Sequence, residues 1–203
     1  MRIRRCGSDA MLVEVDSLDE VDAVRAALAE ADLPGLVELV PAARTVLAAF
    51  QPGSGGLARV KPLLDTIDLT KRVRTEPREV VIPVHYDGPD LDLVAETAGT
   101  DVDGVVALHT GAEYKVAFSG FAPGFGYLVG LPRELRQPRL ENPRKRVEPG
   151  SVAIAGEFTG VYPTASPGGW RLIGRTDVTL FDSRREPAAL LAPGDVVRFE
   201  AVR

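Results

Sequence analysis

The sequence predicts a two-part α+β protein, in which a small sandwich of strands and helices precedes a closed β-barrel. Residues 1–75 hold few prolines and show clear hydrophobic periodicity. Residues 120–170 instead hold 9 Gly and 7 Pro in 51 positions, a density typical of many short strands joined by tight turns. A chain of 203 residues is long enough for two small domains. We therefore expect one domain over residues 1–75 and another over 79–203, joined by a charged linker at 71–78.

The first domain is predicted to follow the element order β-β-α-β-β-α, which is typical of a ferredoxin-like sandwich. Ser17 and Glu20 form a capping box at the start of the first helix, and Pro34 with Gly35 stops it. Pro62 lies inside the second expected helix, where proline is poorly tolerated. The expected strands are 2–5, 11–15, 36–40 and 45–50, and the second expected helix is 55–66.

The second domain is predicted to begin with one strand and two short helices and to continue as strands and turns. Asp90 caps the first of these helices and Gly99 stops it, while residues 100–103 cap the second, which ends near Gly111. A closed barrel suits many short strands, because closure leaves no free sheet edge. The expected strands include 80–84, 151–155, 170–176, 178–181 and 196–202.

The composition argues against several classes of protein. The net charge of −5 disfavours nucleic-acid binding, and no stretch approaches the roughly 20 apolar residues that cross a membrane. The single cysteine, Cys6, excludes an intramolecular disulfide, and the N-terminus has no secretory pattern, so we expect a cytoplasmic location. With one Cys and two His in the chain, we expect no metal site.

The most concentrated chemical signal is a loop rich in aromatic residues, 118–128, here called the aromatic loop. Its rings alternate with Gly and Pro, so the backbone can approach a ligand closely beside an apolar wall. A second signal, residues 160–170, here called the Trp170 loop, offers hydroxyls and backbone N–H groups that suit an anion. In the alternative interpretation both segments are barrel turns, whose aromatic rings fill the core.

A third signal is the basic stretch at residues 132–146, which carries six Arg or Lys against two Glu. Arginine side chains suit a carboxylate or phosphate, because their paired N–H donors match its oxygens. The alternative interpretations are a solvated loop and a surface for an acidic partner.

His109 is the better of the two histidines as a proton carrier, with a structural role as the alternative. No phosphate-binding loop or dinucleotide fingerprint occurs, so no motif supports ATP binding by this chain alone.

Many Gly, Pro and aromatic positions agree at once with one known family, and the agreement is most specific over residues 120–176. The matching segments are 121–125, 127–128, 143–144, 146–147, 149–152, 154–156, 159–160, 162–163, 166–176 and 191–195. On these motifs the whole chain resembles the family of 5-oxoprolinase B subunits, which includes the KipI kinase inhibitors and proteins labelled allophanate hydrolase subunit 1.

The resemblance implies a ferredoxin-like N-terminal domain and a C-terminal cyclophilin-like barrel of the carboxyltransferase type. It also implies partners, namely a larger 5-oxoprolinase subunit with a related barrel (the C subunit, similar to allophanate hydrolase subunit 2) and a third 5-oxoprolinase subunit. Together they would form an ATP-dependent system that opens the lactam of 5-oxoproline to give glutamate. A related pair of domains belongs to urea carboxylase, so allophanate- or urea-type amide metabolism stays open.

The resemblance also implies site residues. In the enzyme hypothesis an arginine holds the substrate carboxylate and a histidine moves protons while the amide opens. The catalytic candidates are His109, Arg144 and Arg146. The substrate-binding candidates are Phe121, Pro123, Gly124, Phe125, Tyr127, Tyr162, Ser166, Trp170 and Arg175.

Two functions of other classes remain open. A KipI-like inhibitor would use the apolar loop surface to hold a sensor histidine kinase. A prolyl isomerase is suggested only by the fold of the barrel, and a fold alone does not carry function.

Overall fold

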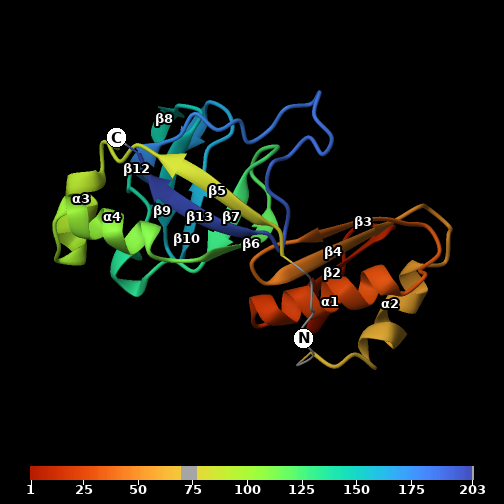
Figure 1. Cartoon of the computed structure of the whole chain (residues 1–203). Helices are drawn as coiled ribbons and strands as arrows, with labels where there is room; N and C mark the ends of the chain where they lie inside the picture. The colour runs from red at the N-terminus through yellow and green to blue at the C-terminus, as the bar shows by residue number, and fades with distance from the viewer. Residues whose placement is uncertain (70–76, 203) are drawn as a thin grey trace. The chain divides into compact units, whose positions relative to one another are not determined.

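The computed structural model describes residues 1–69 and 77–202. The chain divides into two compact units, Met1–Glu76 and Pro77–Arg203 (Figure 1). Residues 71–76 of the predicted linker lie outside the described residues.

The first unit is a four-stranded antiparallel sheet with two helices packed on it. The strand order is β1-β2-β4-β3, so β2, α1 and β3 form a split βαβ unit with β4 between the two strands. This is the arrangement of a ferredoxin-like sandwich. Its elements are β1 (Arg2–Arg5), β2 (Ala10–Glu14), α1 (Leu18–Glu30), β3 (Leu36–Pro41), β4 (Thr45–Phe50) and α2 (Leu57–Leu64).

The first helix begins where its capping residues predict. The Ser17 hydroxyl accepts the Glu20 backbone N–H at 3.2 Å, and the Glu20 carboxylate accepts the N–H of Asp16 at 2.9 Å. The first bond satisfies a backbone donor of the first helical turn, and the second satisfies the N–H of the residue just before the N-cap. Helix α2 contains Pro62 in its second half, and its ends lie two residues inside the predicted 55–66.

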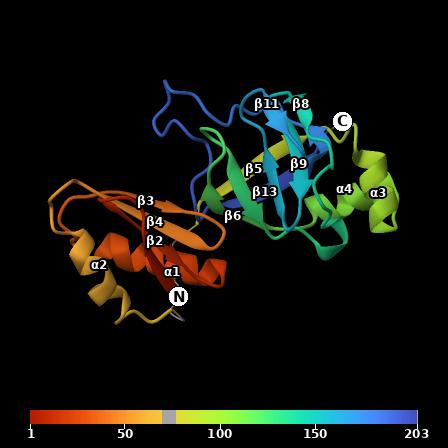
Figure 2. The same cartoon turned by 180° about the vertical axis from the view of Figure 1, so that it is seen from behind.

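The second unit is a seven-stranded sheet that curls into a barrel. The strand order is β12-β9-β10-β7-β6-β13-β5. His85, just after β5, and Arg175, at the end of β12, exchange two backbone hydrogen bonds of 2.8 Å, which join the two edges of the sheet. Helices α3 and α4 pack together against the barrel, on β12 and β13 respectively (Figures 1 and 2). The predicted fold class, a sandwich followed by a barrel, is confirmed.

A short two-stranded sheet, β8 with β11, accompanies the barrel. The predicted strand at 178–181 is wrong: Phe181 forms only an isolated bridge with Ala189, inside a long loop between β12 and β13. Within the described ranges, no helix is long and apolar enough to cross a membrane. The elements of this unit are β5 (Glu79–Val84), α3 (Leu91–Ala98), α4 (Val102–Thr110), β6 (Tyr114–Ser119), β7 (Gly126–Val129), a 3₁₀ helix (Arg133–Leu135), β8 (Arg144–Val147), β9 (Ser151–Ala155), β10 (Phe158–Val161), β11 (Ser166–Gly168), β12 (Arg171–Arg175) and β13 (Val196–Ala201).

Candidate functional site

The aromatic loop and the Trp170 loop meet in the second unit. The Phe125 ring lies 5.5 Å from the rings of both Tyr162 and Trp170, and the Tyr127 ring lies 5.6 Å from Trp170, measured between centroids. All three pairs are edge-to-face, the geometry that aromatic quadrupoles favour. Two loops that are separate in the sequence therefore form one aromatic cluster.

This cluster forms the wall of a pocket of about 260 Å³. Of its lining side chains only one is charged, the guanidinium of Arg139, and the rest are aromatic, proline or glycine. A concave, mostly apolar pocket with one charged group and a few polar ones is typical of a small-molecule site. The lining residues are Phe121, Phe125, Tyr127, Arg139, Pro143, Tyr162, Pro167, Gly168, Gly169 and Trp170.

Phe121 has an unusual backbone at the mouth of this pocket. Its φ is +70°, in the left-handed region that favours glycine, and the residue is 59% exposed. Backbone bonds from Ala122 to Gly120 (2.8 Å) and from Phe125 to Ala122 (2.9 Å) hold the turn. Strained residues of this kind concentrate at functional sites, and an exposed aromatic ring beside a pocket is available to a ligand or partner.

Two glycines make room for the aromatic wall. A Cβ at Gly160 would lie 3.2 Å from the Phe125 ring and 3.3 Å from the Trp170 ring. A Cβ at Gly168 would lie only 2.4 Å from the Tyr162 hydroxyl. The pocket therefore depends on missing side chains as much as on the rings themselves.

Tyr162 is buried at the base of the Trp170 loop. Burial raises the pKa of its hydroxyl, while a hydrogen bond from the Trp170 backbone and the positive charges of Arg139 and Arg144 act in the opposite direction. The Tyr162 oxygen thus accepts the Trp170 N–H. Tyr162 also lines the pocket.

Arg139 lines the pocket, although no sequence motif distinguishes it. It belongs to the basic stretch and is exposed. Its guanidinium forms no ion pair or hydrogen bond with the residues in 1–69 and 77–202. The charge of the stretch was the only sequence signal for it, because nothing local separates Arg139 from its neighbouring arginines.

Arg144 lies beside this pocket but is occupied elsewhere. Its side chain is 27% exposed and donates to Asp90 Oδ1 at 2.7 Å. The second Asp90 oxygen accepts the backbone N–H of Leu172, also at 2.7 Å. Arg144 therefore ties β8 to the start of α3 and to β12, and it does not line the pocket.

The other predicted residues are distributed around the site. Arg146 forms two hydrogen bonds with Glu148 on the surface, and Arg175 pairs with Asp87 at 2.8 Å. Neither arginine lines the pocket. Three further predicted residues flank the pocket and do not line it, namely Pro123, Gly124 and Ser166.

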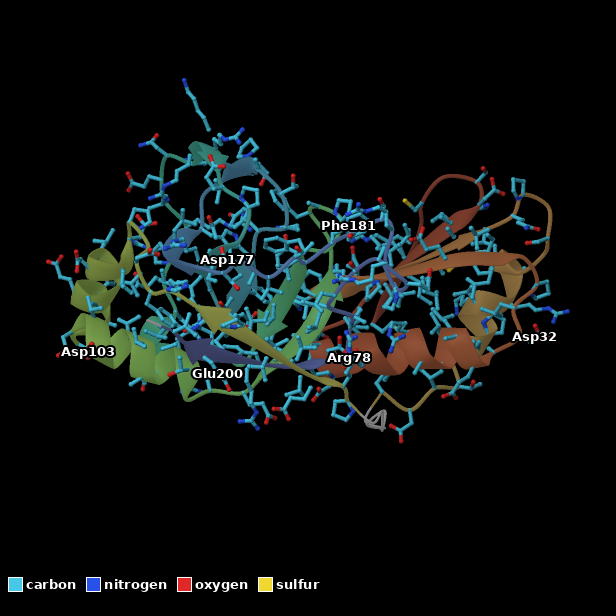
Figure 3. The ribbon with its side chains drawn as sticks, turned by 45° about the horizontal axis from the view of Figure 1, so that its top comes forward. Asp32, Arg78, Asp103, Asp177, Phe181 and Glu200 are labelled. Atoms are coloured by element: carbon cyan, nitrogen blue, oxygen red, sulfur yellow. The ribbon has the colours of Figure 1, made fainter. Side chains whose placement is uncertain are left out.

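The Ser166 hydroxyl is buried without a partner among the described residues. Gly124, at φ +83°, allows the aromatic loop to pack on the β12–β13 loop: a Cβ there would lie 2.7 Å from Phe181 Cβ. Phe181, labelled in Figure 3, lies in this loop. It is 39% exposed.

His109 lies in the barrel core, away from the pocket. It is fully buried, and its Nδ1 lies 2.7 Å from the Tyr86 hydroxyl and its Nε2 lies 3.0 Å from Thr159 Oγ1. Thr159 donates to the Ala153 carbonyl, so Nε2 carries the proton and Nδ1 accepts from Tyr86. Burial lowers the pKa of His109 to about 3. This neutral, fully bonded histidine has a structural environment and does not line the pocket.

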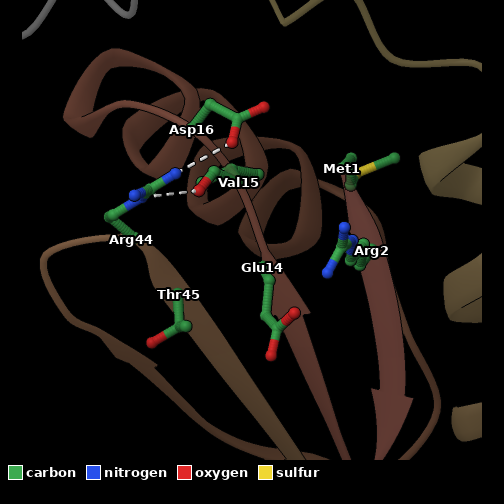
Figure 4. Close-up of a pocket in the computed structure, with 7 residues that line it drawn as sticks. All are labelled: Met1, Arg2, Glu14, Val15, Asp16, Arg44 and Thr45. Carbon is green, nitrogen blue, oxygen red and sulfur yellow. Dashed lines mark hydrogen bonds and ion pairs between the residues drawn. The ribbon is translucent and has the colours of Figure 1, made fainter.

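The first unit has separate hollows. One, of about 410 Å³, lies over β1, β2 and β4 (Figure 4). Its charged groups are largely paired, since Arg44 bonds to Asp16 at 2.9 Å and to the Val15 carbonyl at 3.3 Å. Among the residues that the structure describes, no group of three His, Cys, Asp or Glu could hold a metal ion.

Comparisons with known proteins agree with the family resemblance. The model of the family described as carboxyltransferase domain, subdomain C and D, matches residues 1–191. The chain is 44% identical over 172 residues to the 5-oxoprolinase B subunit of Escherichia coli O157:H7, covering 83% of this chain and 79% of that protein. It is 35% identical over 219 residues to the Bacillus subtilis (strain 168) protein of the same name, covering 98% and 91%.

A crystal structure of a protein designated TTHA0988 has a similar fold, with a TM-score of 0.82 at 36% sequence identity. The match covers 100% of this chain and only 40% of the TTHA0988 chain, so the related structure carries additional sequence. The family match and the two named relatives cover most of this chain. The chain therefore belongs to the family of carboxyltransferase subdomains C and D that includes the 5-oxoprolinase B subunits.

Proposed function

We propose that this chain is the B-type subunit of an ATP-dependent 5-oxoprolinase, a system that opens the lactam of 5-oxoproline to give glutamate. Two relatives that match most of this chain are named as the B subunit of 5-oxoprolinase. The observation that carries the proposal is the aromatic pocket, because its 260 Å³ and its flat apolar walls suit a small cyclic amide. Amide metabolism of the allophanate or urea type uses similar small substrates and stays the alternative within this class.

In this proposal the chain binds and orients the lactam ring of the substrate. The faces of the lactam are covered by Phe125, Tyr127 and Trp170. These side chains exclude water, which strengthens polar contacts inside the pocket. The Tyr162 hydroxyl can donate to the lactam or carboxylate oxygen, and Arg139 supplies a positive charge. No residue of this pocket is a general base at neutral pH, so we assign proton transfer to a partner subunit.

ATP does not fit this pocket as its resident ligand. A triphosphate needs several cations or a glycine-rich phosphate loop, whereas the pocket holds one arginine and the sequence has no such loop. We therefore place ATP on the assembled system and derive no step through it in this chain.

The proposed partners are a larger subunit with a related barrel and a third subunit. The TTHA0988 structure supports a partner, because a chain similar to this one makes up 40% of that longer chain. Phe121 and Phe181 stand exposed on two loops that pack together at Gly124. Exposed aromatic residues beside a pocket favour a protein interface there, so we propose that the pocket mouth is covered by the larger subunit.

Co-expression with the larger subunit tests this function. We expect an equimolar assembly by light scattering and, with the third subunit, glutamate from 5-oxoproline only when ATP is present. A stable assembly that forms no glutamate would contradict the function. Turnover of a urea-type amide would instead favour the alternative substrate.

A second candidate is a KipI-like inhibitor, and the exposed Phe121 and Phe181 are the observation that favours it. In this case the two rings would bind a sensor histidine kinase. A pull-down that recovers a kinase domain, with binding abolished by Phe121→Ala, would favour this function over the enzyme subunit. The prolyl isomerase hypothesis has no comparable observation.

A further inference from the structure

A pocket that selects a carboxylate needs a cation whose donors are free. Around the aromatic pocket the arginines differ sharply in this respect. Arg144 is paired with Asp90, Arg146 with Glu148 and Arg175 with Asp87. Arg139 lines the pocket, and its guanidinium has no partner in the part of the chain that the structure describes.

We infer that Arg139 is the specificity-determining residue of this pocket, and that it selects small ring compounds bearing one carboxylate over neutral lactams. The inference rests on the proposed function in taking a small cyclic amide as the occupant. It goes further in naming the residue and the ligand charge, and it replaces Arg144 and Arg146 in the role of carboxylate holder.

The surroundings of Arg139 favour a carboxylate over a phosphate. A guanidinium presents two parallel N–H donors that match the two oxygens of one carboxylate. The other lining residues bring no second cation that a dianion would need. They also bring no acidic side chain that would neutralise Arg139 when the pocket is empty.

The aromatic wall strengthens this recognition. Arg139 lies close enough to Tyr162 for its charge to act on the Tyr162 hydroxyl. An ion pair flanked by Tyr162 and Trp170 is screened less by water than one on an open surface. The ring of a bound acid would meet the aromatic wall while its carboxylate meets Arg139, so both halves of the ligand are recognised.

The test uses Trp170 as its reporter, since it is the only tryptophan of the chain and lines the pocket. The full chain is titrated with three probes while Trp170 emission is followed. The probes are 5-oxoproline, which has ring amide and carboxylate, pyrrolidin-2-one, which lacks the carboxylate, and cyclopentanecarboxylate, which lacks the amide. The variants are Arg139→Gln, Arg139→Lys and, as a matched control, Arg133→Gln, an exposed arginine of the same basic stretch that does not line the pocket.

We expect 5-oxoproline to bind at least about tenfold more tightly than pyrrolidin-2-one, because a charged hydrogen bond contributes that much or more. Arg139→Gln should remove this difference and leave pyrrolidin-2-one binding unchanged. Arg139→Lys should keep part of it, and Arg133→Gln should match the wild type. Because Arg139 is exposed and unpaired, the thermal midpoint of the variants should equal that of the wild type.

Three results would overturn the inference: equal affinity for the acid and the neutral lactam, unchanged discrimination in Arg139→Gln, or no saturable change with any probe. Its failure is separable from failure of the proposed function. If Arg139 selects ring acids but the assembly forms no glutamate, the function is wrong and the inference stands. If the assembly forms glutamate but Arg139→Gln binds 5-oxoproline with the affinity of the wild type, the inference is wrong and the proposed function stands.

Discussion

Arg144 and Asp90, 54 positions apart in the sequence, form an ion pair of 2.7 Å directly behind the Trp170 wall. Asp90 is buried and also accepts the backbone N–H of Leu172, two residues after Trp170. The Asp90 carboxylate, at the start of α3, therefore joins the backbone of β12 to the Arg144 side chain of β8. Arg144 Nη1 also lies 3.5 Å from the Trp170 carbonyl oxygen, so the pair contacts the backbone of the aromatic wall without lining the pocket itself.

We predict that Arg144→Gln lowers the free energy of unfolding by about 2–3 kcal/mol, because a buried carboxylate loses its charged partner. Urea denaturation followed by Trp170 emission measures this. Arg146→Gln is the control, since it breaks an exposed pair that water already screens, and no measurable change is expected. Equal stability of the two variants would show that the Asp90 pair does not hold the wall.

His109 should make stability depend on pH. Its folded pKa of about 3 lies below its ordinary value of 6.5 because of burial, so the unfolded chain binds a proton that the folded chain rejects. Stability from the neutral ring is complete above pH 6.5 and falls by about 1.4 kcal/mol per pH unit below it. We expect unfolding curves from pH 7 to pH 5 to show this slope in the wild type and to lose it in His109→Gln. The same slope in both proteins would contradict the buried neutral state.

The two adjacent glycines of the Trp170 loop provide a matched pair of substitutions. Gly168→Ala places a methyl group 2.4 Å from the rigid Tyr162 hydroxyl, whereas Gly169→Ala meets Pro143 at an ordinary 3.5 Å. We predict that Gly168→Ala shifts Trp170 emission and weakens 5-oxoproline binding at least about tenfold. Fluorescence titration of both variants checks this, and an equal loss in Gly169→Ala would mean that loop entropy, not Tyr162, is responsible.

Phe121 combines a left-handed backbone with an exposed ring. Phe121→Gly should relieve strain of the order of 1 kcal/mol and leave the folded chain at least as stable against urea. It should nevertheless weaken assembly with the larger subunit, because the exposed ring is lost. Phe121→Ala loses the ring but keeps the strain, so it should weaken assembly to the same degree and be less stable than Phe121→Gly. Undiminished assembly in both variants, measured by light scattering, would exclude this ring from the interface.

Local patterns predict the fold well. The Ser17 capping box, the Gly99 stop and the dense Gly and Pro turns are short-range signals, and each appears in the structure at the expected place. The prediction of a strand at 178–181 was wrong, because β-propensity does not tell whether a partner strand lies alongside to pair with it. The candidate residues on the aromatic loop and on the Trp170 loop followed from composition together with the family resemblance, and the structure brings their rings together.

The roles of the charged residues were beyond local patterns. The partner of Arg144 lies 54 positions away, that of Arg175 lies 88 away, and the Tyr86 and Thr159 partners of His109 lie 23 and 50 away. A free arginine and a paired one look alike in sequence. Only the tertiary fold separates Arg139 from its neighbours, which is why the sequence pointed to a basic stretch and not to this residue.

The most direct test of the account is the rate of ATP-dependent glutamate formation from 5-oxoproline by the co-purified assembly. The assembly is made with the wild-type chain, with Arg139→Gln and with Arg133→Gln. The account predicts glutamate with the wild type and with Arg133→Gln, and a KM for 5-oxoproline raised at least about tenfold with Arg139→Gln. The same KM for all three assemblies, or no glutamate from an intact wild-type assembly, would contradict it.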